Sequence, residues 1–130
     1  MSSKQYKSWE LYTCLALNRL AHELGIDIYQ SNIEPVLEEL YKKPVQGIPK
    51  AEISYEIKSN HQMTNKVLKK LESDGLICIE KIEKKYQISI TKKGVLYLRK
   101  FNVFFASMYK DQIYQHYRYQ QIPSWFKRQE

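Results

Sequence analysis

The chain has 130 residues, of which 43% are hydrophobic and 27% charged, and its formal net charge is +7. This length suits one domain with its own core, and the composition is typical of a globular rather than a disordered protein. Because the sequence contains no run of about 18 apolar residues and its first residues lack a signal peptide's apolar centre, we expect a cytoplasmic protein without a membrane span.

The positive charge is unevenly distributed along the chain. Residues 1–41 carry three basic and six acidic side chains, residues 42–100 carry fourteen and six, and residues 101–130 carry four and two. A basic excess concentrated in the middle of a chain is typical of nucleic-acid binding. A lysine-rich surface that is merely solvated is the plainer alternative.

Two helices are expected in the first third of the chain. Ser8 can cap a helix over residues 9–24, whose wide apolar face needs neighbours on two sides. Ser31 and Glu34 form a capping box for a second helix that ends before Pro44, and we expect this one to open a three-helix unit. Residues 45–48 then form a loop.

The next segment predicts a helix-turn-helix. Pro49 suits the first position of a short helix, and Ser59 with Gln62 forms a capping box for a second helix that begins near Asn60. One face of that helix is apolar and the opposite face carries amides and lysines. The helix stops at Gly75, which can adopt the left-handed conformation of a helix end. The apolar face consists of Thr64, Val67, Leu68 and Leu71.

A two-stranded ribbon and a further helix follow. Residues 76–82 and 86–90 are rich in β-branched and aromatic side chains, with Glu83, Lys84 and Lys85 as a short hairpin loop. Thr91 caps the helix after the ribbon. Gly94 in its first turn costs helix stability, and a close approach of that helix to the ribbon would explain the glycine.

Residues 48–100 resemble the winged-helix transcriptional regulators of the MarR and PadR type. The resemblance rests on Leu68, Leu71, Gly75, Leu76 and Ile77, followed by Thr91, Lys93 and Gly94. It implies a mainly α fold with a small two-stranded β-wing, in which extra N- and C-terminal helices form a dimer interface. The first helix would contribute to that interface, or else cover only the core of its own subunit.

The last quarter of the chain predicts one long helix. From Gly94 to Pro123 there is no proline or further glycine, so a helix over about residues 92–120 would project and bury its apolar stripe against a second copy of the chain. The predicted interface is Leu98, Phe101, Phe105, Met108, Tyr109, Ile113 and Tyr117. The residues after it, Pro123, Trp125, Phe126, Lys127 and Arg128, would dock on that dimer or fray.

These elements give a single domain over residues 1–130. Residues 1–30 are an N-terminal helix and connector, residues 31–91 the winged-helix core, and residues 92–130 a dimerisation helix and tail. The expected function is sequence-specific binding of double-stranded DNA by a homodimeric repressor on an inverted repeat. The candidates for reading bases are Gln62, Asn65 and Lys66, and those for contacting the DNA backbone are Ser59, His61, Lys69, Lys70, Lys81, Lys84 and Lys85.

Two alternatives stay open: a winged-helix protein of plasmid or phage partition or replication, and a protein-interaction adaptor that does not bind DNA. We expect no enzyme, cofactor or metal, because the three histidines have no metal-ligand spacing and no phosphate-binding glycine loop is present. Tyr12, Tyr29, Tyr41 and the C-terminal aromatic residues are candidates to line an effector pocket, although packing in the core or at an interface is the simpler explanation. Cys78 is a candidate redox switch, with two reduced thiols as the expected state.

Overall fold

The structure is a computed structural model that describes residues 8–43 and 47–127. Seven helices and three strands lie in these ranges. They are α1 Trp9–His22, α2 Ile33–Tyr41, β1 Ile48–Pro49, α3 Lys50–Ile57, α4 His61–Ser73, β2 Ile77–Ile82, β3 Lys85–Ile90, α5 Lys92–Met108, α6 Lys110–His116 and α7 Ser124–Lys127. None of the described helices combines the length and apolar character that a membrane crossing requires.

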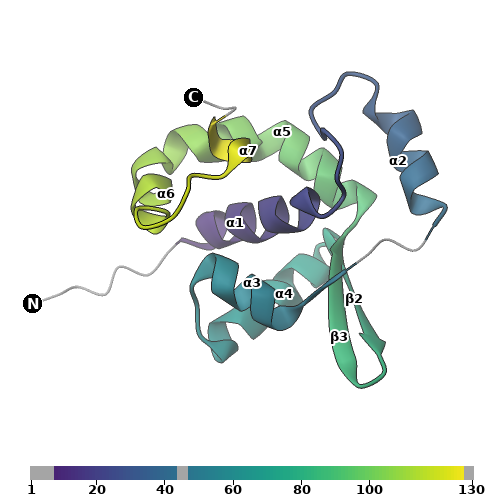
Figure 1. Ribbon diagram of the computed structural model, residues 1–130, viewed down its shortest axis with the longest axis horizontal. Helices are drawn as coiled ribbons and strands as arrows, with labels where there is room; N and C mark the ends of the chain where they lie inside the picture. Colours follow the sequence, from purple (N-terminus) through teal and green to yellow (C-terminus); the bar gives the residue numbers. More distant parts are fainter. Residues whose placement is uncertain (1–7, 44–46, 128–130) are drawn as a thin grey trace, which may run out of the picture.

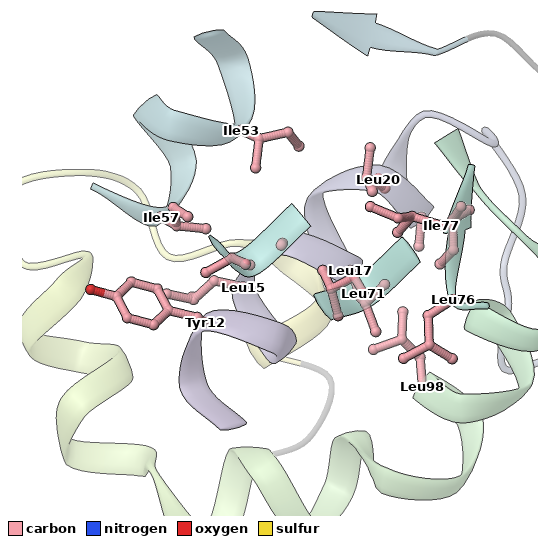
Figure 2. Close-up of a cluster of buried hydrophobic side chains, with 14 of the residues drawn as sticks. Tyr12, Leu15, Leu17, Leu20, Ile53, Ile57, Leu71, Leu76, Ile77 and Leu98 are labelled. Carbon is pink, nitrogen blue, oxygen red and sulfur yellow. The ribbon is translucent and has the colours of Figure 1, made fainter. Parts of the chain in front are cut away.

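Helix α1 lies at the centre of the molecule, with α5 on one side and α3 and α4 on the other (Figure 1). Every residue from Leu11 to Ala21 except Arg19 is buried. The wide apolar face predicted for this helix is therefore covered on both sides by its own chain. Figure 2 shows its side chains gathered with those of α3, α4, β2 and α5.

The three-helix unit consists of α1, α3 and α4, which pack on one another. The expectation that α2 opens this unit is wrong. Helix α2 lies to the side, where Ile33 and Leu37 are buried and the Tyr41 hydroxyl donates a hydrogen bond to the carbonyl of Ile90 at 2.6 Å. An amphipathic helix needs only one partner surface, and the start of α5 with the end of β3 supplies it.

The ribbon is a three-stranded antiparallel sheet in the order β1-β3-β2. The predicted hairpin is confirmed, with Ile77 opposite Ile90 and Ile82 opposite Lys85. Residues 48 and 49 pair with β3, although Ile48 is predicted to lie in a loop over residues 45–48. Residues 45 and 46 of that predicted loop lie outside the described residues. Lys85 belongs to β3, so the turn consists of Glu83 and Lys84 alone.

The tail is not one long helix. Helix α5 ends at Met108, Tyr109 is non-helical with φ −111° and ψ 22°, and α6 and α7 fold back on the chain. The reversal buries Ile113, Tyr117 and Phe126, which a projecting helix would have left in water. Phe126 docks edge-on to Tyr114, while Arg128 lies outside the described residues.

Buried residues from every helix and all three strands join one hydrophobic cluster. Helices α3 and α4 and the wing thus lie on one side of α1, and α5 on the other (Figure 1). The order helix, helix-turn-helix, hairpin, helix is that of a winged helix-turn-helix, so the predicted fold class is confirmed, with the short β1 as an addition.

Candidate nucleic-acid interface

The turn between α3 and α4 is fixed by hydroxyl and amide hydrogen bonds. Asn60, not Ser59, caps α4, because its side chain accepts a hydrogen bond from the Met63 amide at 2.8 Å. The predicted Ser59 capping box is wrong. Ser59 instead shares a hydrogen bond of 2.8 Å with the Thr64 hydroxyl, which also lies 2.7 Å from Ser54 on α3. These contacts tie the two helices together at the turn.

Helix α4 presents one face to the core and the other to solvent. Thr64, Val67, Leu68 and Leu71 are buried, as predicted. The exposed positions 62, 65, 66 and 69 follow helical spacing, so Gln62, Asn65, Lys66 and Lys69 form a continuous outward stripe. Two amides and two ammonium groups on one exposed face can donate to both base edges and phosphates.

The start of α4 carries a cation that sequence reasoning missed. Lys50, the first residue of α3, places its Nζ 3.3 Å from Nε2 of His61. The two residues are far apart in sequence, and only the crossing of α3 over α4 brings them together. No local pattern in the sequence therefore identifies Lys50 as part of this site. The pair adds positive charge at a helix N-terminus, which already favours anions.

The remaining backbone candidates differ in how free they are to reach DNA. Lys69 is exposed, whereas the Lys70 ammonium lies 3.3 Å from the Asp74 carboxylate. Ser59 is only half-exposed, with its hydroxyl engaged at Thr64. Lys70 and Ser59 would have to give up or share these partners to bind a phosphate.

The three wing lysines point in different directions. The strand register puts Lys81 opposite Tyr86, on the face of the ribbon that carries the buried Ile88 and Ile90. Its ammonium lies 5.9 Å from the centre of the Tyr86 ring. Lys85 is on the opposite face, and Lys84 is at the turn, where Glu83 and Lys84 both have positive φ, 49° and 72°. This turn has the backbone of a type I′ hairpin.

The predicted dimer residues are mostly core residues of their own chain. Leu98, Phe105, Ile113 and Tyr117 are 5% exposed or less, so they are unavailable to a second copy in this conformation and that part of the prediction is wrong. Phe101 and Tyr109 are half-buried, and Met108 is exposed. The face of α5 that does point outward carries Leu96, Val103, Phe104 and Met108, which are 42%, 61%, 50% and 59% exposed. We call these four residues the outer stripe of α5.

Neither cysteine has the surroundings of a reactive thiol. Burial raises the pKa of Cys14 to about 12. Partial burial and the neighbouring Glu80 carboxylate raise the pKa of Cys78, so little thiolate forms at neutral pH. The residues at 8–43 and 47–127 contain no cluster of His, Cys, Asp or Glu suited to a metal ion.

A cavity of about 250 Å³ lies between α1 and α7. Of the three tyrosines named as candidates for an effector pocket, Tyr29 lines this cavity. Asn18 and Trp125 line it as well. Tyr12 and Tyr41 are not among its lining residues. Asn18 is buried and donates to the Asn102 side chain at 2.9 Å, so its amide supports the packing of α1 on α5.

Comparison of the sequence with models of protein families finds no match, and comparison with curated proteins finds none either. Among solved structures, the chain is similar to one described as the crystal structure of MarR. The identity is 16%, the match covers 88% of this chain and 80% of that one, and the TM-score is 0.41. We recognise the winged helix from the order, register and packing of the chain's own elements, independently of this likeness.

Proposed function

We propose that the protein is a sequence-specific double-stranded DNA-binding regulator of transcription, acting without catalysis or a cofactor in the cytoplasm. The observation that carries this proposal is the exposed stripe of Gln62, Asn65, Lys66 and Lys69 on α4, held outward by a fully buried apolar face. In a winged helix this helix enters the major groove, where base edges present distinct donors and acceptors.

Each group on the stripe has a chemical role in this proposal. Gln62 and Asn65 can bind adenine through two hydrogen bonds, and Lys66 can donate to guanine; each such contact contributes about 1–3 kcal/mol of discrimination. Lys69, His61 and Lys50 lie around the same helix and are suited to phosphates. Lys84 at the turn and Lys81 on the core face of the wing would reach the flanking backbone.

The proposed assembly is a homodimer that binds an inverted repeat and acts as a repressor. The outer stripe of α5 supports it, because a monomer rarely leaves such a row of large apolar side chains in water. A twofold dimer would place two α4 helices about 34–36 Å apart, one turn of duplex. A partition or replication protein would bind runs of direct repeats instead, which footprinting distinguishes.

The DNA-binding proposal is tested by charge reversal on α4. Lys66→Glu combined with Lys69→Glu should abolish retention of mixed-sequence duplex at low salt, because two positive charges on the α4 stripe are replaced by two negative charges that repel the phosphates. The matched control is Lys42→Glu with Lys110→Glu, an equal charge change on two exposed residues, one directly after α2 and the other the first residue of α6. Equal binding by both variants, with folding intact by circular dichroism, would favour a protein-interaction adaptor.

A further inference from the structure

The end of α6 is joined to the end of α3, the first helix of the helix-turn-helix. Tyr117 donates its hydroxyl hydrogen to the Glu56 carboxylate, and Lys58 donates from its ammonium to the carbonyl of His116. Nε2 of His116 lies 2.7 Å from the carbonyl oxygen of Glu56. A carbonyl only accepts, so the imidazole is the donor there. We call Glu56, Lys58, His116 and Tyr117 the α3–α6 clasp.

The α6 side of the clasp is buried, whereas Glu56 is half-buried and Lys58 is exposed. His116 and Tyr117 are 6% and 5% exposed. Two of the three hydrogen bonds involve a charged group, and the bond from the buried Tyr117 hydroxyl to the Glu56 carboxylate has the more water-excluded setting, in which such bonds are stronger. Burial and the hydrogen bond to Glu56 raise the pKa of Tyr117, so its hydroxyl remains a donor throughout the physiological range. Arg19 of α1, with its Nε 3.9 Å from the other Glu56 oxygen, balances the carboxylate.

The clasp acts at the residue where the chain turns from α3 towards α4. Lys58 is left-handed, with φ 51°, and directly precedes Ser59 and Asn60, which bind α4 through Thr64 and Met63. Its ammonium belongs to the most basic segment of the chain, but its hydrogen bond is to the carbonyl of His116 at the end of α6. Lys58 is thus placed to hold the turn rather than to contact DNA.

The other end of α6 is connected to α5 by one residue. Tyr109 separates the two helices, and α5 carries the exposed outer stripe. A rotation of α5 in one subunit would therefore carry α6 with it, and the clasp would pass this movement to the helix-turn-helix. We propose that the α3–α6 clasp sets the orientation of α4 for DNA, and that Lys58, His116 and Tyr117 are positioning residues for DNA binding. This inference rests on the proposed function.

The test uses Tyr117→Phe, which removes one hydroxyl and keeps the buried ring, with Lys58→Met as a second variant that keeps the aliphatic stem. Tyr119→Phe is the matched control, because Tyr119 is 83% exposed and lies outside the clasp. The probe is a set of duplexes that the full-length wild-type protein selects from a random-sequence pool. We expect affinity to fall on the order of 10-fold, equivalent to about 1.4 kcal/mol, in both clasp variants and to stay unchanged in the control.

Salt dependence separates positioning from direct contact. The slope of log affinity against log salt concentration should match that of the wild type, because no phosphate contact is lost. Lys69→Ala should instead lower the magnitude of the slope by about 1. A reduced slope in Lys58→Met would mean that Lys58 touches phosphate, and the inference would be wrong.

Hydrogen exchange supplies a readout without DNA. Amides of residues 59–66 should exchange faster in Tyr117→Phe than in the wild type and in Tyr119→Phe, since the turn has lost a restraint. Unchanged exchange there, or normal affinity despite faster exchange, would refute the clasp's role. Failure of the wild-type protein to bind any duplex at low salt would refute the proposed function itself.

Discussion

At Gly94 the backbone of α5 lies against the strand that enters the wing. An ideal Cβ at this position would lie 2.3 Å from the carbonyl oxygen of Leu76 and 2.6 Å from Cγ1 of Ile90. Both neighbours are held in the core, so neither can move aside. The close approach expected from the sequence is confirmed, and it explains a glycine in the first turn of a helix.

Gly94→Ala should therefore lower the free energy of unfolding by a net of at least about 2 kcal/mol. The clash is with a backbone atom, so the overpacking cost should be at or above the upper end of its usual range of about 1–3 kcal/mol. Alanine's advantage in helix propensity offsets about 1 kcal/mol of that cost. Urea unfolding monitored by circular dichroism measures the difference. The control is Gly75→Ala, where φ is +77° but the nearest atoms belong to the flexible Lys93 side chain at 3.5 Å; backbone strain alone should cost about 1–2 kcal/mol there. Equal losses in the two variants would contradict the steric account.

Single residues also show where local sequence signals succeed. Ser8 and Thr91 cap α1 and α5 as predicted, because each is directly followed by a helix that the core holds in place. The pattern at Ser59 is equally good, yet Asn60 is the cap. The Ser59 hydroxyl is used to join α4 to the turn, and a one-residue shift in the start of a helix depends on tertiary contacts that local spacing does not encode.

Among the elements, α2 is attached to the rest of the chain by few polar contacts. The Tyr41 hydroxyl donates to the Ile90 carbonyl at 2.6 Å, and Lys92 lies 2.6 Å from Glu38. Burial raises the pKa of Tyr41 to about 12, from an ordinary value of 10.0. The unfolded chain ionises this tyrosine first, so its contribution to stability is present below pH 10 and is lost as the pH rises from 10 to about 12.

Tyr41→Phe tests this attachment. At pH 8 the variant should be less stable by about 1 kcal/mol, the usual net contribution of a hydrogen bond. Between pH 10 and 12 the wild type should lose stability faster than the variant, and because this loss exceeds the difference at pH 8, the two curves should converge and then cross. Urea unfolding at four pH values from 8 to 11.5 measures this. Parallel curves would mean that Tyr41 titrates with an ordinary pKa in the folded state.

The apolar period of the sequence was sufficient to predict α4 and the hairpin but not the tail. Residues 92–120 contain no helix breaker after Gly94, and the reversal at Tyr109 has no local signal. It is favoured because Ile113, Tyr117 and Phe126 find a partner surface in their own chain. Periodicity identifies an apolar face but not the surface that covers it, which is why four predicted interface residues are core residues instead.

For the whole molecule, the central position of α1 separates two surfaces. The helix-turn-helix and wing lie on one side of it and α5 on the other (Figure 1). The predicted subdivision treated residues 1–30 as an addition to the winged-helix core, whereas α1 packs against α3, α4, α5 and β3. Because α1 is apolar on nearly all sides, it is a core helix in this fold. Its burial makes it unavailable to a second copy, and α5 therefore provides the proposed dimer contact.

The outer stripe of α5 gives the prediction for the assembled protein. Phe104→Glu places a charge in the middle of the stripe, where Phe104 is 50% exposed and Val103 beside it is 61% exposed. The fold should survive because the side chain already faces solvent, whereas a dimer seam would have to bury an unpaired carboxylate. Sedimentation equilibrium should then show a monomer for the variant and a dimer for the wild type.

The loss of the dimer in Phe104→Glu should also be measurable as weaker DNA binding. On a duplex with two half-sites, the monomeric variant should bind at least about 100-fold more weakly, because the second contact is no longer intramolecular. On a duplex with one half-site, both proteins should bind alike, since the α4 stripe is intact. Tyr119→Glu is the control, an equally drastic change at an exposed aromatic residue beyond α6. If Phe104→Glu remained a dimer with full affinity, the two copies would meet through another surface, and the outer stripe would have no part in assembly.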